Sequence, residues 1–147
     1  MELDFGITKG SCHVIQDEHV SGLFKIFCEN SENLRGNSPS PAGADLFRRD
    51  AGGLLNDSKK EIFHTCTKTF IFIAKCACTD VVLPVSVLCG RVRNPTKDDW
   101  KKLKLLIDYL KATKELNLDL SLDGCIPVMK CYVDEMVAVH EDFKAHT

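Results

Sequence analysis

The pattern of hydrophobic and polar residues is clearest between residues 91 and 116, where it predicts an amphipathic helix. Thr96 follows Pro95 and can act as the N-cap, and Asp98 and Asp99 place negative charge in the first turn. Hydrophobic side chains recur at helical spacing and form one apolar stripe: Trp100, Leu103, Ile107 and Leu110. The polar residues outside that stripe predict a solvated face: Lys101, Lys102, Lys104, Asp108 and Lys111.

Two helices are predicted earlier in the chain. The first begins at Asp17, which can serve as its N-cap, and ends near Asn30. Its apolar face comprises Val20, Leu23, Phe24 and Phe27. The second begins at Ser58, which together with Glu61 has the spacing of a capping box. Its apolar face comprises Phe63, Cys66, Thr67, Phe70, Ala74 and Ala77.

Another helix is predicted from Thr79 or Asp80 to about Val92, and Pro84 is a fault in it. With Asp80 as the cap, Pro84 stands at the fourth helical position, where its missing N–H removes the first internal hydrogen bond. A proline inside a helix costs up to about 3 kcal/mol. We therefore expect this helix to be the weakest of the four.

Strands are predicted at both ends of the chain. Residues 1–15 alternate weakly around a Lys-Gly-Ser turn at 9–11 and predict a β-hairpin. Residues 117–122 alternate cleanly, and after an Asp-Gly turn signal residues 127–133 predict the antiparallel partner strand. The expected fold class is α+β and mainly helical, with an N-terminal β-hairpin, about four helices and C-terminal antiparallel strands.

Residues 29–58 are rich in Asn, Ser, Gly, Pro and Asp and predict a linker, with Leu46 and Phe47 contacting the body. Structureless connections of this length are uncommon inside a compact domain, so we expect a boundary or a disordered arm. The predicted division is a hairpin plus helix at 1–30, a linker at 31–57, a helical region at 58–116 and a strand region at 117–147.

The composition indicates a soluble globular chain of about one domain. It has 147 residues, of which 44% are hydrophobic and 27% charged. The formal net charge is −2, so no global field attracts nucleic acid or a membrane, and any nucleic-acid contact has to be local. The longest apolar run, residues 70–74, is too short to cross a bilayer, which predicts no membrane contact.

The eight cysteines are expected to be free thiols, mostly buried, in a reducing compartment. No secretory signal pattern stands at the N-terminus, which predicts an intracellular protein, cytoplasmic or nuclear, that is not secreted. Zinc binding is disfavoured because the cysteines form no paired Cys-x-x-Cys motifs. A cysteine nucleophile would need a nearby histidine, with Cys66 and His64 or Cys131 and His140 as candidate pairs. Such a site is disfavoured, because His64 and Cys66 are two residues apart on a helix and do not face each other.

Arg91, Asn94-Pro95 and Trp100 precede a basic helix that ends in the five residues Tyr-Leu-Lys-Ala-Thr at 109–113. This order resembles the segment that joins reverse transcriptase to ribonuclease H in copia-type retrotransposon polyproteins, where the helix ends in Tyr-Leu-Lys-Gly-Thr or a close variant. Further segments resemble that family in the same order along the chain: 1–5 (primer-grip strand), 14–27 (first thumb helix), 63–74 (a thumb or connection helix), 75–80 and 130–147 (start of ribonuclease H).

The chain also departs from the family pattern. Cys76, Cys78 and Thr79 stand where the family usually has two arginines and a proline, and Pro84 replaces a small residue. These changes remove two cations that could contact phosphate and add a helix breaker. A sequence released from function is expected to change in this way.

The resemblance implies a truncated and catalytically inactive chain. Nucleotidyl transfer and ribonuclease H cleavage both use two metal ions held by several converging carboxylates. Asp134 matches the first metal-binding aspartate of ribonuclease H, while the polymerase aspartates would precede Met1 and the other ribonuclease H carboxylates would follow Thr147. A vestigial aspartate forms only an incomplete metal site, so no cofactor is expected, and Mg²⁺ belongs to the intact parent enzyme alone.

Weak binding to an RNA–DNA or DNA duplex is the function that the resemblance leaves. In this family the thumb helix follows the minor groove, which assigns nucleic-acid contacts to Gln16, Gly22 and Lys25. Cations of the amphipathic helix would add phosphate contacts: Lys101, Lys104 and Lys111. The alternative is a non-enzymatic helical module that docks an unknown protein partner on its Trp100 face.

Overall fold

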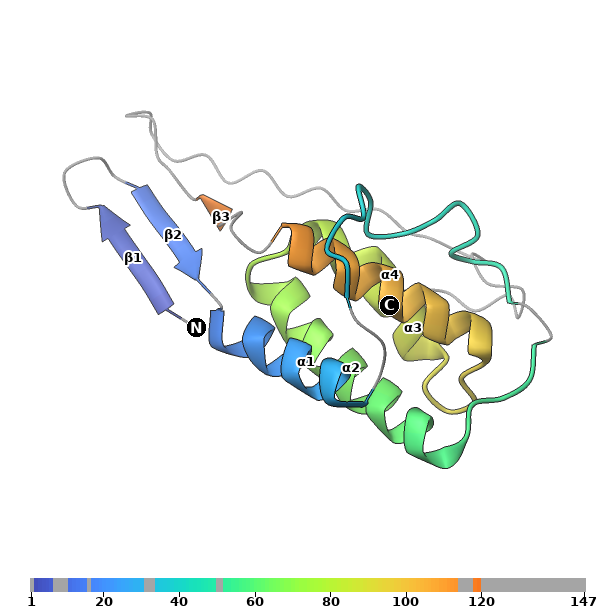
Figure 1. Cartoon of the computed structure of the whole chain (residues 1–147). Coiled ribbons are helices and arrows are strands. Elements are labelled where there is room, and N and C mark those ends of the chain that lie inside the picture. Colours follow the sequence, from blue (N-terminus) through green and yellow to red (C-terminus); the bar gives the residue numbers. More distant parts are fainter. Residues whose placement is uncertain are drawn as a thin grey trace.

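A computed structural model describes residues 2–6, 11–15, 17–30, 34–49, 52–113 and 118–119 (Figure 1). Four helices make up most of this part of the chain: α1 (Asp17–Asn30), α2 (Asp57–Cys76), α3 (Val82–Gly90) and α4 (Lys97–Ala112). A short 3-10 turn, η1 (Thr79–Val81), joins α2 to α3. The prediction of a mainly helical protein with about four helices is confirmed.

Three short strands accompany the helices in the described part of the chain. Strands β1 (Glu2–Gly6) and β2 (Ser11–Ile15) pair antiparallel, with Gly6 opposite Ser11. Strand β3 (Leu118–Asp119) pairs antiparallel with β2, which gives the strand order β1-β2-β3. The predicted partner strand at 127–133 lies outside the described residues.

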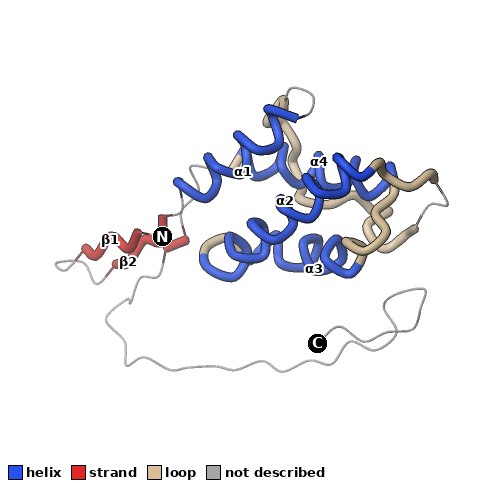
Figure 2. Tube along the Cα trace, turned by 90° about the horizontal axis from the view of Figure 1, so that it is seen from below, coloured by secondary structure: helices blue, strands red, loops and turns tan. Residues whose placement is uncertain are grey.

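The core forms where the apolar faces of the four helices meet. Helix α2 packs against α1 on one side and against α3 on the other (Figure 2). The predicted apolar stripes point inward, and the side chains that are completely enclosed include Leu23, Phe27, Phe63, Cys66, Phe70, Leu103, Leu106 and Ile107. Truncating an enclosed phenylalanine to alanine costs about 3–5 kcal/mol, so Phe27, Phe63 and Phe70 are the main hydrophobic anchors of the body.

Helix α2 begins before the predicted capping box. Its N-cap is Asn56, whose side-chain oxygen accepts a hydrogen bond from the Lys59 amide at 3.1 Å. The prediction that Ser58 caps this helix together with Glu61 is therefore wrong, because Ser58 is already the second helical residue. Asparagine caps as well as serine does, and here the earlier residue satisfies the first-turn amide.

Pro84 does not disrupt its helix, contrary to the prediction from the sequence. Helix α3 begins at Val82, after the separate 3-10 turn at Thr79–Val81, so Pro84 is the third residue of the helix. The first amides of any α-helix have no partner within the helix, and a missing N–H at this position loses no α3 hydrogen bond. Because the 3-10 turn precedes α3, the buried Pro84 is accommodated in the first turn of α3 without interrupting that helix.

The start of α4 confirms the sequence prediction. Thr96 is the N-cap, and its hydroxyl accepts from the Asp99 amide at 3.2 Å while the Asp99 carboxylate accepts from the Thr96 amide at 2.9 Å. Leu103, Ile107 and Leu110 are buried, as the stripe predicted. Both halves of a capping box are present, which fixes where α4 begins.

Residues 34–49, which we call the strap, form no helix or strand, yet they pack on the body. Leu34 is part of the hydrophobic core, and Leu46 and Ser38 are also buried. Phe47 is half-buried, so the predicted contact of Leu46 and Phe47 with the body is confirmed. A loop packed in this way is a layer of the helical body, unlike a disordered arm.

Candidate nucleic-acid interface

One side of α4 carries a row of polar residues at spacings of four and three: Lys97, Lys101, Lys104, Asp108 and Lys111. Residues at these spacings are neighbours on a helix surface, so the row runs for roughly 21 Å at 1.5 Å per residue. Lys97 and Lys101 are exposed, and Lys104 is half-buried. We call these three lysines the basic ridge.

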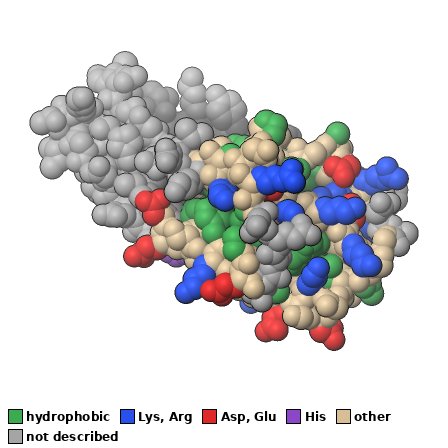
Figure 3. All heavy atoms as spheres, in the orientation of Figure 1, with side chains coloured by type: hydrophobic (Ala, Val, Ile, Leu, Met, Phe, Trp, Pro, Cys, Tyr) green, Lys and Arg blue, Asp and Glu red, His purple; other side chains and the backbone are tan. Residues whose placement is uncertain are grey.

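Basic side chains gather on the face of the molecule that carries α4 and the strap (Figure 3). Residues 52–113 hold 11 Lys and Arg against six Asp and Glu, although the whole chain has a net charge of −2. The positive charge is therefore local. Sequence reasoning missed Lys97, which its spacing of four from Lys101 would have placed on the same side of the helix.

The second half of the polar row is occupied by the strap. The Asp108 carboxylate accepts hydrogen bonds from the backbone amides of Arg35 at 2.8 Å and Gly36 at 3.1 Å. The Lys111 ammonium group donates to the Leu34 carbonyl at 2.9 Å. Asp108 is half-buried beneath these backbone groups, so the prediction of a solvated face is wrong for it. Lys111 is exposed as predicted, although its ammonium group is engaged by the strap.

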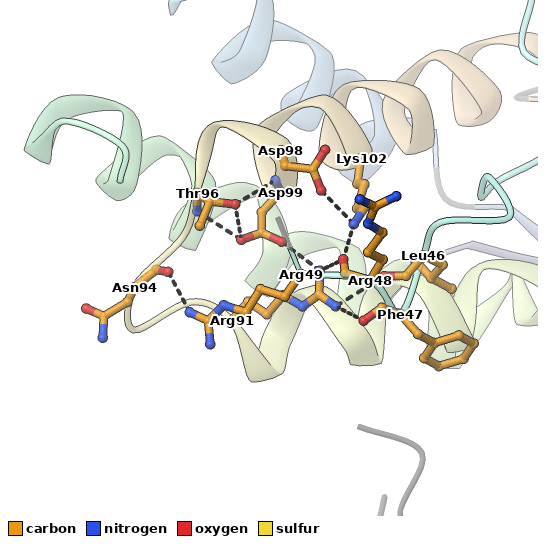
Figure 4. A network of polar contacts seen from close by, with 10 residues as sticks. All are labelled: Leu46, Phe47, Arg48, Arg49, Arg91, Asn94, Thr96, Asp98, Asp99 and Lys102. Atoms are coloured by element: carbon orange, nitrogen blue, oxygen red, sulfur yellow. Dashed lines mark hydrogen bonds and ion pairs between the residues drawn. The ribbon is translucent and has the colours of Figure 1, made fainter. Parts of the chain in front are cut away.

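Arg91 ties down the other end of the strap (Figure 4). Its side chain is only 7% exposed and donates to the Asp99 carboxylate at 2.8 Å. The same guanidinium donates to three consecutive strap carbonyls at 2.8–3.3 Å: those of Leu46, Phe47 and Arg48. Arg91, which the resemblance singled out as a motif residue, thus joins the strap to the N-terminus of α4.

Lys102 extends this network. It is buried, so the prediction that it lies on a solvated face is wrong. Its side chain is 7% exposed and pairs with the Asp98 carboxylate at 2.7 Å. It also donates to the Arg48 carbonyl, so both Arg91 and Lys102 reach the same strap residue (Figure 4). A lysine committed in this way is not available for phosphate contact.

The buried Asp99 carboxylate remains charged. Burial by itself would raise its pKa, but the hydrogen bonds from Thr96 and the Arg91 guanidinium outweigh burial and hold the pKa of Asp99 below its usual range. Asp99 therefore has two roles: it forms an ion pair with Arg91, and it accepts from the Thr96 amide in the α4 capping box. Its charge links the helix start to the strap.

The sequence-predicted binding residues fall into three groups. Lys25 on α1 and Lys101 on α4 are exposed, and the two helices meet where the Phe27 and Trp100 rings stack with centroids 5.3 Å apart. Gly22 has open space where a Cβ would stand, so nothing in the body requires glycine there. Lys104 and Lys111 are described above, and Gln16 and Asp134 lie outside the described residues.

Trp100 makes contacts within the helical body. It is half-buried, stacks on Phe27, and lies 5.4 Å from the Lys59 ammonium group in a cation–π contact. Such a contact contributes about 0.5–1 kcal/mol at an exposed site. The ring therefore helps to join α1, α2 and α4, and much of its surface is covered by the chain itself.

Three of the described cysteines are poor nucleophiles: Cys66, Cys78 and Cys89. The five cysteines between Cys28 and Cys89 are free, but among them only Cys66 is fully buried, so the prediction of mostly buried thiols is wrong for these five. Burial raises the pKa of Cys66 to about 12 and that of Cys89 to about 11, and burial followed by the Asp80 charge raises the pKa of Cys78. These thiols stay protonated near neutral pH and lack the reactive thiolate form.

Two further searches cover the described part of the chain. No cluster of three or more His, Cys, Asp or Glu side chains there is arranged to hold a metal ion. None of its helices combines the length and the apolar character needed to span a membrane. Both findings apply to these residues only.

Comparisons with models of known protein families, with curated proteins and with solved structures give no match to this chain. The likeness to copia-type polyproteins therefore rests on the residue patterns described above. The function proposed below is therefore based on the surface of the protein itself.

Proposed function

We propose that these 147 residues are a copia-type reverse transcriptase and ribonuclease H segment that, taken by itself, binds nucleic-acid duplexes weakly and catalyses no reaction. The thumb and connection of that family correspond to α1–α4, and the ribonuclease H start to residues 117–147. We also propose that the strands predicted at the C-terminal end of this sequence form an incomplete ribonuclease H-like sheet. The observation that carries the binding function is the basic ridge, whose Lys97 and Lys101 are exposed on one side of α4.

Binding would rest on phosphate contacts. Successive lysines of the ridge are about 4.5–6 Å apart along the helix axis, which suits contacts to the phosphates along one strand. Lys25 on α1 is a further exposed cation. Two or three phosphate contacts to B-DNA predict a slope of about −2 to −3 for log K against log salt, and Kd values in the usual range of non-specific binding, about 10⁻⁴–10⁻⁶ M.

The absence of catalysis is inferred from the carboxylates that the family uses. Asp134 is the one aspartate of this sequence that matches a metal ligand of the family. A two-metal centre needs several carboxylates that converge on the ions, so Asp134 alone would hold no metal pair. We accordingly propose that the chain has no cofactor of its own.

Fluorescence anisotropy with a labelled RNA–DNA hybrid and a DNA duplex, at low and moderate salt, tests the proposal. We expect binding at low salt that weakens on salt addition, and a loss of most of it in the double variant Lys97→Gln, Lys101→Gln. Lys68→Gln is the matched control, because Lys68 is exposed on α2, outside the ridge. Binding that is unchanged in the ridge variant would contradict the assigned surface. Metal-dependent cleavage of the hybrid, abolished by Asp134→Asn, would contradict the absence of catalysis.

The alternative is a helical protein-interaction module, and a surface other than the predicted Trp100 face supports it. Trp100 is largely engaged within the body, whereas three large hydrophobic side chains of α2 and α3 are exposed: Phe72, Val82 and Leu83. Exposed apolar side chains are a feature of docking surfaces when they form a contiguous patch. A wild-type chain that fails to bind either duplex at low salt would favour this alternative.

A further inference from the structure

A hollow of about 470 Å³ lies between the first half of α2 and the segment that joins α3 to α4. Six residues line it: Asp57, Lys60, Glu61, His64, Val92 and Arg93. Pockets that hold small ligands typically have volumes of about 300–1,000 Å³, so this hollow has room for one.

The ionisable side chains that line the hollow have no polar partner among the described residues. Among the residues that the structure describes, none forms a hydrogen bond or ion pair with the side chains of Asp57, Lys60, Glu61, His64 or Arg93. The neighbouring cation Arg91 differs sharply, since it is buried and fully engaged with Asp99 and the strap. The hollow therefore offers two cations and two carboxylates that are available to a ligand.

This charge pattern selects the ligand class. A purely anionic group would be repelled by Asp57 and Glu61, and a cation by Lys60 and Arg93. A nucleoside monophosphate satisfies both sets, because Arg93 and Lys60 can donate to the phosphate while the carboxylates accept hydrogen bonds from ribose hydroxyls. The half-buried side chain of Val92 adds an apolar surface for the base. Carboxylates that accept from the 2′-hydroxyl would favour ribose over deoxyribose.

The hollow is at the same end of the body as the basic ridge. Residues 92–93 lead directly into α4, and the chain before α2 is bonded to the start of α4: the Leu55 amide donates to the Pro95 carbonyl at 3.0 Å and the Lys97 amide to the Gly53 carbonyl at 3.1 Å. An RNA strand whose phosphates contact Lys97 and Lys101, and which ends beside the start of α4, would thus have its terminal nucleotide close to the hollow.

We propose that this hollow binds a ribonucleoside monophosphate unit, either free or as the end of an RNA strand. The free form needs only the hollow, whereas the strand-end form rests on the duplex-binding function proposed above. Arg93 and Lys60 contact the phosphate, and Glu61 and Asp57 contact the ribose.

NMR titration of the full chain with AMP, dAMP and inorganic phosphate tests the assignment. We expect AMP to bind more tightly than dAMP, and phosphate alone to bind more weakly than either. Arg93→Ala should weaken AMP binding about tenfold or more, the scale of a lost charged hydrogen bond. Arg35→Ala is the matched control, since Arg35 is an exposed arginine of the strap outside the hollow.

Glu61→Gln is the second variant, and it should reduce the preference for AMP over dAMP while leaving phosphate binding intact. The proposal is overturned if AMP does not bind, if phosphate binds as tightly as AMP, or if Arg93→Ala has no effect. A failure of AMP binding alongside intact duplex binding overturns only this inference. The reverse result overturns the duplex interface and leaves the hollow as a site for the free nucleotide.

Discussion

Replacing Arg91 by methionine is the strongest test of how the strap is held. The variant keeps an unbranched side chain of similar length but removes the guanidinium that serves Asp99 and three strap carbonyls. Removing one partner of a buried ion pair typically costs about 3–5 kcal/mol, because the other charge stays buried without compensation. With Asp99 fully enclosed, we expect a loss of that size in the free energy of unfolding.

Urea unfolding followed by the fluorescence of Trp100, the single tryptophan, measures this loss. Trp100 is half-buried and stacked on Phe27, so its emission reports on the packed body. Arg93→Met is the matched control, because Arg93 is exposed and unpaired among the described residues, and surface substitutions of this kind usually change stability by less than about 0.5 kcal/mol.

The pH dependence gives a second readout. The folded protein holds the pKa of Asp99 below its usual range, so the stabilisation from this carboxylate is present above the unfolded pKa and is lost as pH falls through the folded pKa. In Arg91→Met burial dominates, and protonation of Asp99 relieves the uncompensated charge. The deficit of the variant should therefore be largest near neutral pH and should shrink in acid. A deficit below about 1 kcal/mol, or one independent of pH, would refute the reasoning.

Three further predictions concern the strap and the α4 surface. Gly36→Ala should destabilise the protein by about 1–2 kcal/mol, because Gly36 has φ +66° and a Cβ would lie 3.0 Å from the Lys111 side chain, whereas Gly52→Ala, with open space around it, should have little effect in the same denaturation assay. Asp108→Asn should speed hydrogen exchange of the two strap amides that this carboxylate accepts from; unchanged exchange would show that the strap is held elsewhere. Asp80→Asn should lower the pKa of Tyr109 in a spectrophotometric titration, since the hydrogen bond to Asp80 is the main cause that raises that pKa to about 12.

Local patterns of the sequence were sufficient for the helices. The start of α4 follows from Thr96 and Asp99, three residues apart, and its buried face follows from apolar residues at helical spacing. Both signals act within a few residues of each other along the chain, where helical geometry fixes which groups meet. The errors at Ser58 and Pro84 are errors of boundary, because the cap of α2 is Asn56, two residues before Ser58, and a 3-10 turn precedes α3.

The candidate surfaces were harder to predict, because they depend on residues far apart in the chain. The sequence alone determines that α4 has a polar face, and it places lysines there at regular spacing. Only the tertiary structure decides that the strap covers Asp108 and engages Lys111, and that Arg91 and Lys102 are buried beneath it. Buried Leu34 and Leu46 anchor the strap, and Leu46 was predicted to do so, but the polar contacts of the strap are made by backbone carbonyls and amides. Every residue type supplies these groups, so the sequence did not predict which α4 residues they would meet.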